Sequence, residues 1–375
     1  MAGPLSGLKV VEMAGLGPCP LAGQLLADLG ADVVVIDRKS AKADPSDINR
    51  RSKRSIALNL KSEGGLLVAK KLIANADILI EGFRPGVMEK LGLGPKDCHQ
   101  KNPGLVFGRM TGWGQDGPLA KSAGHDINYL AITGALHAIG RKGEPPVPPL
   151  NLVADYAGGT MFLLLGVLSA LYERQTSGLG QVVDAAMVDG VPALMGLTHM
   201  MFAKGQWSNN REDNLLDGGA PFYRTYETSD GKYVSVGPLE PQFFAELVEK
   251  AGLPETRKQT QYDRATWPDC HKELETVFKS KSRDEWTALF EGGDACIAPI
   301  LNFDEVENFP HNKARGIFQT HDGVMQAAPA PRFDRTPSAS IGQPLCAGAS
   351  NEEVLREYGF SAQEIAVLIS DGAVV

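Results

Sequence analysis

Three residues are candidates for acid/base chemistry because of where they stand in the sequence. His125 follows a glycine-containing loop and opens a predicted helix, and Asp155 stands just before a long apolar helical stretch. Glu240 precedes Pro241, and proline is typical of the first position of a helix. Each also has an ordinary interpretation, since a single histidine is more often structural and an acidic residue there can cap its helix. Position alone makes them candidates for proton transfer and leaves both interpretations open.

The residues after Asp155 add a second unusual feature. Gly158 and Gly159 fall in the first turn of the helix predicted from Tyr156 to Thr176. A glycine weakens a helix by about 1 kcal/mol. It is tolerated where a ligand must approach the backbone closely. We therefore expect backbone N–H groups at the start of this helix, which carry partial positive charge, to bind an oxyanion.

A basic cluster near the N-terminus contrasts with the net charge of −8. Two aspartates accompany seven basic residues: Arg38, Lys39, Lys42, Arg50, Arg51, Lys53 and Arg54. One interpretation is a solvated positive face, and the other is a phosphate-binding cradle, because guanidinium groups bind phosphate with two charge-assisted bonds. The cluster is short and has no aromatic residues for base stacking, which favours a small phosphorylated ligand over a nucleic acid. The overall negative charge also argues against a nucleic-acid partner.

Strand and helix patterns alternate through the first third of the chain. The predicted strands are 9–12, 32–37, 77–80 and 105–109, and the predicted helices between them are 21–29 and 64–74. Alternation of this kind predicts a Rossmann-like α/β domain with a parallel sheet. The first turn does not predict nicotinamide binding, because Pro20 stands where a dinucleotide fingerprint needs glycine.

The pattern changes in the second half of the chain. Ser229-Asp230-Gly231 is a hairpin signal between two strand-like segments, and helical patterns follow it. We predict a large α/β domain over residues 1–190, completed by residues 325–375, and a small α+β domain over residues 223–310. Residues 191–222 and 311–324 are predicted to be the two linkers.

Composition is that of a globular protein, with 43% hydrophobic and 22% charged residues. Five widely spaced cysteines predict neither a disulfide framework nor a zinc site. The longest apolar run, residues 161–171, is shorter than the roughly 20 residues of a membrane span. We see no secretion signal and no peroxisomal address, so a cytoplasmic protein without a membrane partner is expected.

Four segments in this order resemble the α-methylacyl-CoA racemases, which lie within the wider family III of CoA-transferases. They are Gly124–Tyr129, Asn151–Asp155, Leu216–Pro221 and Glu240–Phe243, and the resemblance extends over nearly the whole chain. It implies an interlocked homodimer, an acyl-CoA substrate, a place in fatty acid metabolism and no separate cofactor. It also implies that His125 and Asp155 are the catalytic acid/base pair. Glu240 would hydrogen-bond the histidine from the partner chain.

The same resemblance implies a set of substrate-binding residues. Arg38 matches an arginine that contacts the adenine nucleotide of CoA. Lys90 stands where some members have arginine, so it keeps the charge but not the bidentate geometry. The remaining implied substrate and CoA contacts are Leu58, Asn59, Leu60, Lys61, Gly82, Phe83, Arg84, Gly124, Asp126, Ile127, Asn128 and Tyr129.

The implied reaction interconverts the 2R and 2S forms of a 2-methylacyl-CoA through a planar enolate, with one base on each face of the α-carbon. The alternative is an acyl-CoA:carboxylate CoA-transferase, in which Asp155 is a nucleophile that forms a mixed anhydride. His125 favours the racemase, because the transferases generally lack a histidine there. A non-catalytic acyl-CoA sensor is disfavoured because all three candidates are retained. Met187, Met195, Met200 and Met201 are expected either to contact the acyl chain or simply to pack.

Overall fold

The computed structural model describes residues 3–38, 44, 46–338 and 341–375, which form two compact units. Unit 1 comprises Met1–Thr133, Leu150–Leu194 and Gly316–Val375, and unit 2 comprises Gly134–Pro149 and Met195–Arg315. Two boundaries differ from the prediction, since residues 134–149 and most of the predicted linker 191–222 belong to unit 2. The reason is a tertiary contact, because Arg211 donates hydrogen bonds to the carbonyl oxygens of His137, Arg141 and Glu144.

Unit 1 is built on a parallel sheet of six strands, which confirms the predicted fold class. In spatial order they are β3 (Arg54–Ala57), β2 (Asp32–Asp37), β1 (Lys9–Met13), β4 (Ile78–Glu81), β5 (Val106–Thr111) and β6 (Val182–Ala186). Every pairing between neighbours is parallel. The apolar run in β2 is buried from Val33 to Ile36, as expected for a strand covered on both faces. The order 3-2-1-4-5-6 is that of the Rossmann fold.

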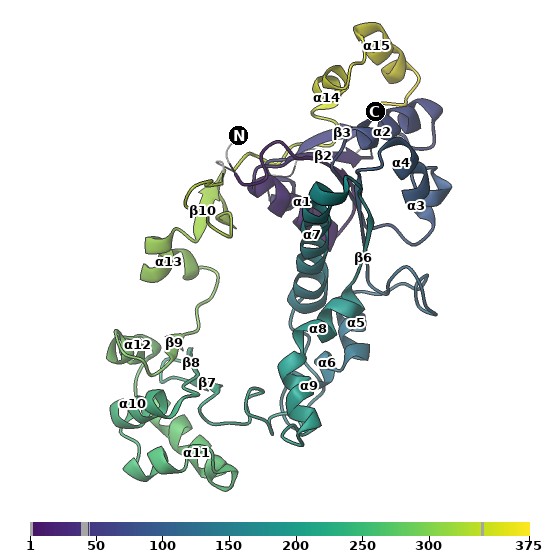
Figure 1. Cartoon of the computed structure of the whole chain (residues 1–375). Helices are drawn as coiled ribbons and strands as arrows, with labels where there is room; N and C mark the ends of the chain where they lie inside the picture. Colours follow the sequence, from purple (N-terminus) through teal and green to yellow (C-terminus); the bar gives the residue numbers. More distant parts are fainter. Residues whose placement is uncertain (1–2, 39–43, 45, 339–340) are drawn as a thin grey trace. The chain divides into compact units, whose positions relative to one another are not determined.

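Both ends of the chain contribute to the core of unit 1. Its N-terminal part holds α1 (Pro18–Asp28), a 3-10 turn η1 (Ile48–Arg50), α2 (Glu63–Ala74), α3 (Val87–Lys90) and α4 (Pro95–Lys101). The C-terminal part adds a β10 (Phe318–His321) and β11 (Val324–Ala327) hairpin, α14 (Asn351–Glu357) and α15 (Ala362–Ser370). In Figure 1, α14 and α15 lie near β3 and α2. Val354 and Leu355 of α14 are fully buried in the same cluster as Ile56 of β3.

The helices of the candidate site follow β5 in the chain, and η2 and α7 contact β5 and β6. They are α5 (Asp126–Thr133), the π-helix η2 (Leu152–Thr160), α7 (Met161–Ser177) and α8 (Met187–Leu194). The predicted start at Tyr156 was therefore late, and the first nine residues are wound as a π-helix. π-Helices are rare in proteins, and those that occur are often found at functional sites.

The two glycines after Asp155 are explained by helix packing. A Cβ atom on Gly158 would lie 3.0 Å from the backbone nitrogen of Val191, and one on Gly190 would lie 1.9 Å from the carbonyl oxygen of Gly158. Gly159 packs in the same way against Met187. The close approach predicted from these glycines is therefore made by α8.

The combined helix Leu152–Ser177 is long and apolar enough to cross a membrane by length and composition. The expectation based on residues 161–171 alone missed this, because the helix begins nine residues earlier. One such helix is weak evidence for a span, since the core helix of a globular protein passes the same test. Here α7 contacts β5 and β6 of the sheet along one face.

Unit 2 is an α+β unit, as predicted for the second half of the chain. Its antiparallel sheet contains β7 (Arg224–Glu227), β8 (Tyr233–Val236) and β9 (Ile297–Pro299). The predicted hairpin turn lies between β7 and β8, with Gly231 at φ 73°. The helices are α6 (Ala135–Ala138), α9 (Gly196–Ala203), α10 (Pro241–Ala251), α11 (Trp267–Phe278), α12 (Arg283–Phe290) and α13 (Pro310–Arg315), with 3-10 turns η3 (Glu255–Gln259), η4 (Arg264–Thr266) and η5 (Val306–Asn308). Aromatic side chains dominate its core, Phe222, Phe244 and Trp286 among them.

Candidate active site

His125 and Asp155 are connected through one buried carboxylate. Oδ2 of Asp126 accepts hydrogen bonds from the backbone N–H groups of Ala154 at 2.8 Å and Asp155 at 2.9 Å. Asp126 is only 4% exposed and directly follows His125 in the chain. The start of α5 and the start of η2 are therefore held against each other, which places both predicted catalytic residues in one site.

The His125 end of this site is fixed by its own helix start. The backbone N–H of His125 donates to Oδ1 of Asn128 at 3.0 Å, and the backbone N–H of Asn128 donates to the carbonyl oxygen of His125 at 2.8 Å. This reciprocal pair is a helix cap. Asn128, expected to contact the substrate, thus has a structural role that orients the histidine backbone, while the His125 side chain stays exposed.

The carboxyl group of Asp155 is half-buried and its pKa is raised above the ordinary value for aspartate. Desolvation is the main cause, and the negative charge of Asp126 acts in the same direction. A hydrogen bond from the Asn151 side chain, at 3.5 Å, and the charge of His125 lower the pKa and only partly offset these effects. Gly17 lies beside the carboxyl, since a Cβ atom there would be 3.7 Å from Oδ2 of Asp155. A carboxyl with a raised pKa exchanges a proton more readily near neutral pH.

Tyr129 supports the loop that carries the histidine. Its hydroxyl donates to the carbonyl oxygen of Gly124, and its ring packs edge-on against Trp113 with centroids 4.8 Å apart. A Cβ atom on Gly112 would lie 2.0 Å from this ring. Tyr129 is 7% exposed. Within the described chain this side chain packs against the Gly124–His125 loop, and the substrate contact implied by the resemblance stays a prediction.

The other implied CoA contacts gather at one edge of the sheet. Arg38 follows β2, residues 58–61 follow β3, and residues 82–84 follow β4. Because these strands are parallel, their carboxyl ends meet at the same edge, where ligands of such sheets bind. Lys90 is exposed at the end of α3. Leu58 also follows β3, but its side chain is 2% exposed and belongs to the hydrophobic core, unlike the exposed side chains of Arg38 and Lys90.

The phosphate-cradle interpretation does not hold for four members of the basic cluster. Nitrogen–oxygen distances of 2.5–2.6 Å join Arg50 to Asp37, Arg51 to Asp28, Lys53 to Glu12 and Arg54 to Asp32. These cations tie β1, β2 and α1 to residues 50–53 and to the first residue of β3. Arg38 is exposed and carries the positive charge that the interpretation requires, whereas Lys39 and Lys42 lie outside the described residues. The partners are 13 to 41 residues away in sequence, so local charge counting could not reveal them.

The predicted oxyanion donors at the start of the helix are partly occupied. Asp126 already accepts the N–H groups of Ala154 and Asp155. Asp126 was expected among the substrate contacts, and its role as a cap for η2 was missed. No sequence signal reveals it, because the contact joins residues 28 positions apart.

Glu240 belongs to unit 2, where it precedes α10. It is exposed, and its side chain makes no capping hydrogen bond. Glu240 therefore occupies the N-cap position of α10, as its place before Pro241 predicted, but it caps the helix without its side chain. Its carboxylate accepts no hydrogen bond from the first turn of α10.

A family model described as CoA-transferase family III matches residues 5–348. The chain belongs to CoA-transferase family III. It is 46% identical to the alpha-methylacyl-CoA racemase of Mus musculus over 370 residues, which cover 98% of this chain and 96% of the relative. Its identity with the alpha-methylacyl-CoA racemase of Homo sapiens is 44%, with the same coverage.

The solved structures of family III proteins agree with the fold. The crystal structure of a CAIB/BAIF family protein from Brucella suis matches with a TM-score of 0.83 at 26% identity, covering 96% of this chain and 100% of that one. For this family III chain, the match extends across both units. The parallel six-stranded sheet is therefore the family's fold as well as the predicted one.

Proposed function

We propose that this chain is a racemase that interconverts the 2R and 2S forms of 2-methylacyl-CoA thioesters. The observation that carries the proposal is the joining of His125 and Asp155 by Asp126, with a raised pKa on the Asp155 carboxyl. The relatives named racemases share nearly half of the sequence along almost the whole chain. CoA is part of the substrate, so the proposed reaction needs no separate cofactor.

The reaction removes one α-proton and returns another to the opposite face. His125 accepts the α-proton of one epimer. The electron pair of the broken C–H bond passes into the thioester carbonyl, and a planar enolate forms. Asp155 then donates a proton to the other face, and the roles reverse for the opposite epimer. The raised pKa of Asp155 suits this exchange, because the carboxyl keeps a proton at higher pH than an ordinary aspartate does.

The enolate oxygen needs hydrogen-bond donors. The backbone N–H groups of Asp126 and Ile127 open α5 next to His125, and no acceptor for either lies among the described residues. The start of a helix also carries partial positive charge. We propose these two N–H groups as the oxyanion site, in place of the donors expected at the start of the helix predicted from Tyr156.

A second copy of the chain is the proposed partner. One face of α7 exposes a stripe at helical spacing, formed by Met161, Leu165, Leu168 and Tyr172, the last 77% exposed. An apolar stripe of this kind marks an interaction surface. The opposite face packs on β5 and β6 of the sheet, which supports the interpretation of α7 as a core helix with one uncovered side. We propose that a homodimer covers the stripe and that Glu240 reaches His125 of the partner chain.

The test uses optically pure (2R)-2-methylacyl-CoA in deuterated water. Chiral chromatography and mass spectrometry should show both epimers with deuterium at the α-carbon. His125→Ala and Asp155→Ala should each abolish epimer interconversion. Transfer of CoA to an added carboxylic acid, with the α-proton retained, would instead establish the transferase with Asp155 as nucleophile. Binding without either reaction would leave only an acyl-CoA sensor.

A further inference from the structure

Unit 2 contains an open cavity of about 610 Å³ that the proposed proton transfer does not use. Its walls are formed by Ile139 to Val147 on one side and by the segment after Leu216, together with β7 and β8, on the other. Apolar side chains dominate the lining: Ile139, Val147, Leu216, Tyr223 and Val236. The cavity therefore suits the apolar body of a small molecule.

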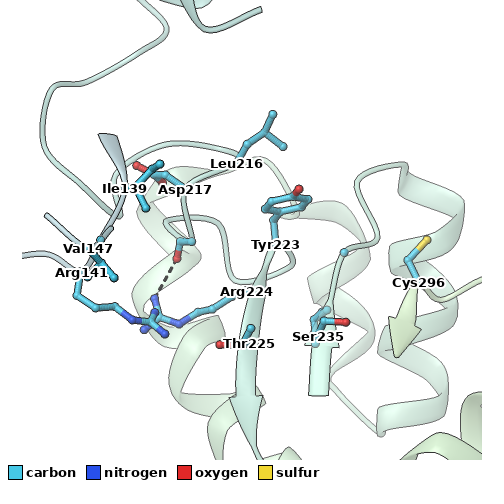
Figure 2. Close-up of a pocket in the computed structure, with 14 residues that line it drawn as sticks. Ile139, Arg141, Val147, Leu216, Asp217, Tyr223, Arg224, Thr225, Ser235 and Cys296 are labelled. Carbon is cyan, nitrogen blue, oxygen red and sulfur yellow. Dashed lines mark hydrogen bonds between the residues drawn. The ribbon is translucent and has the colours of Figure 1, made fainter. Parts of the chain in front are cut away.

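Two arginines converge at this cavity. Figure 2 shows the side chains of Arg141 and Arg224 pointing toward each other from opposite walls. Both are held by Glu212, whose Oε1 lies 2.6 Å from Nη1 of Arg141 and 3.1 Å from Nη1 of Arg224. Nη1 of Arg224 also donates to the carbonyl oxygen of Gly218 at 2.9 Å. The guanidinium groups are thus oriented before any ligand arrives.

The two arginines keep free hydrogen-bonding capacity. Each uses Nη1 in the contacts above, and within the described part of the chain Nε and Nη2 of both have no acceptor. Burial raises the pKa of Glu212, but the hydrogen bonds from the Lys142 amide and the Arg141 guanidinium outweigh it and lower the pKa, so Glu212 is ionised. The positive charges of Arg141 and Arg224 therefore face one negative carboxylate. An arginine fork with free donors binds a carboxylate best.

Asp217 also lines the cavity, but its oxygens are engaged in its own loop. Oδ1 accepts the N–H groups of Asn214 at 2.9 Å and Gly219 at 3.0 Å, and Oδ2 accepts Nδ2 of Asn214 at 2.8 Å. Asp217 therefore does not compete for the free guanidinium donors. Its negative charge weakens the site for an anion without occupying it.

We propose that this cavity binds a small carboxylic acid with an apolar body, the carboxylate pairing with Arg141 and Arg224. Two sources supply this chemistry: a free fatty acid, or an acyl chain with a carboxylate at its far end. The binding step does not depend on racemisation. It is tested by binding alone, and the source is then found by kinetics.

The binding test is calorimetric titration of the full chain with octanoate and with its neutral analogue octanamide. The unaltered protein should bind octanoate about ten-fold more tightly, since charge-assisted hydrogen bonds are about twice as strong as neutral ones. Arg141→Gln should remove this preference. Lys142→Gln is the matched control, because it removes the same charge from the next, exposed residue, which does not line the cavity. Its preference should be unchanged.

The proposal is overturned if octanamide binds as tightly as octanoate, or if the Arg141 and Lys142 variants behave alike. Should Arg141→Gln lower the melting temperature, Val147→Trp provides a second variant, because it fills the cavity and leaves every polar contact in place. It should weaken octanoate binding about ten-fold or more. Unchanged octanoate affinity in Val147→Trp would place the binding elsewhere and overturn the proposal too.

Kinetics then separate the two sources. The ratio of kcat/KM for a 2-methylacyl-CoA ending in a carboxylate to that of the same chain ending in methyl is measured in the Arg141 and Lys142 variants. A fall of this ratio in Arg141→Gln alone assigns the site to the end of the substrate. An unchanged ratio with lost octanoate binding assigns it to a free acid. A protein inactive with both substrates contradicts the proposed racemase and leaves the binding result intact.

Discussion

At the scale of single residues, Asp126 sets the environment of the proposed catalytic pair, His125 and Asp155. It is buried, it caps the start of η2, and its charge raises the pKa of the Asp155 carboxyl. Among the described residues, its second oxygen, Oδ1, is buried and has no hydrogen-bond partner. An unsatisfied buried carboxylate oxygen costs stability, so its presence beside the proposed catalytic pair calls for a functional explanation.

Asp126→Asn is expected to shift the pH dependence of racemisation. The side-chain oxygen of Asn can still accept both backbone N–H groups, but the negative charge is gone. The pKa of Asp155 should then fall, because one of the causes that raise it is removed while desolvation remains. The pH at which Asp155 loses its proton in the kcat/KM profile should therefore move to lower pH. An unshifted profile would show that Asp126 acts through its hydrogen bonds alone.

At the scale of elements, close glycine packing sets the position of the π-helix. Gly158 of η2 and Gly190 of α8 touch backbone to backbone, with no room for a Cβ atom on either. Asp155 lies in the same π-helix, three residues before this contact. We therefore expect a displacement of α8 to move the carboxyl of Asp155, the proposed catalytic residue.

Gly190→Ala is expected to lower both the melting temperature and kcat. Its new methyl group would meet the carbonyl oxygen of Gly158 at 1.9 Å, so α8 must shift. We expect the free energy of unfolding to fall by about 1–3 kcal/mol, the range for overpacked cores. Gly196→Ala is the matched control, since nothing lies within 4 Å of its Cβ position in α9. Thermal unfolding and steady-state kinetics measure both variants, and equal effects would contradict the packing argument.

The ion pair between β1 and the segment before β3 is a second element-scale feature. Lys53 donates to Glu12 at 2.6 Å, and both side chains are 3% exposed. Burial raises the pKa of Glu12 to about 7, although Lys53 acts against this. Because this pKa is above its unfolded value, the stability that Glu12 contributes is present below pH 4.5 and declines as the pH rises through about 7.

Glu12→Gln is expected to destabilise the protein by about 3–5 kcal/mol at pH 8 for a separate reason, because it leaves the buried Lys53 ammonium without a counter-charge. Glu12→Leu combined with Lys53→Met should recover most of that loss. The double variant should also lack the decline in stability between pH 5 and pH 8. Urea denaturation at several pH values measures this, and a double variant as unstable as the single one would contradict the account.

At the scale of the whole molecule, the site is proposed to be complete only in a dimer. His125 and Asp155 lie in unit 1, and Glu240 lies in unit 2. The exposed stripe on α7 supports the presence of a second copy. A dimer leaves two arrangements to separate: Glu240 acts on His125 of its own chain, or on His125 of the partner chain.

Complementation between two inactive variants answers this question. Asp155→Ala and Glu240→Ala are co-expressed with different affinity tags, and the mixed dimer is isolated. If Glu240 acts across the dimer, one of the two sites in the mixed dimer combines an intact Asp155 with an intact Glu240, and activity returns. If it acts within its own chain, neither site is complete. An inactive mixed dimer, with each parent inactive alone, would therefore refute the shared site.

Local patterns in the sequence determined the parallel sheet, the α+β second unit and the candidates His125 and Asp155. Strands buried on both faces and loop-to-helix junctions leave such patterns within a few residues. Tertiary structure alone decided the rest. Four residues of the basic cluster form ion pairs, Asp126 caps η2, and residues 134–149 belong to unit 2. These outcomes depend on contacts between residues far apart in the chain, and the sequence carries no local record of the distance between them.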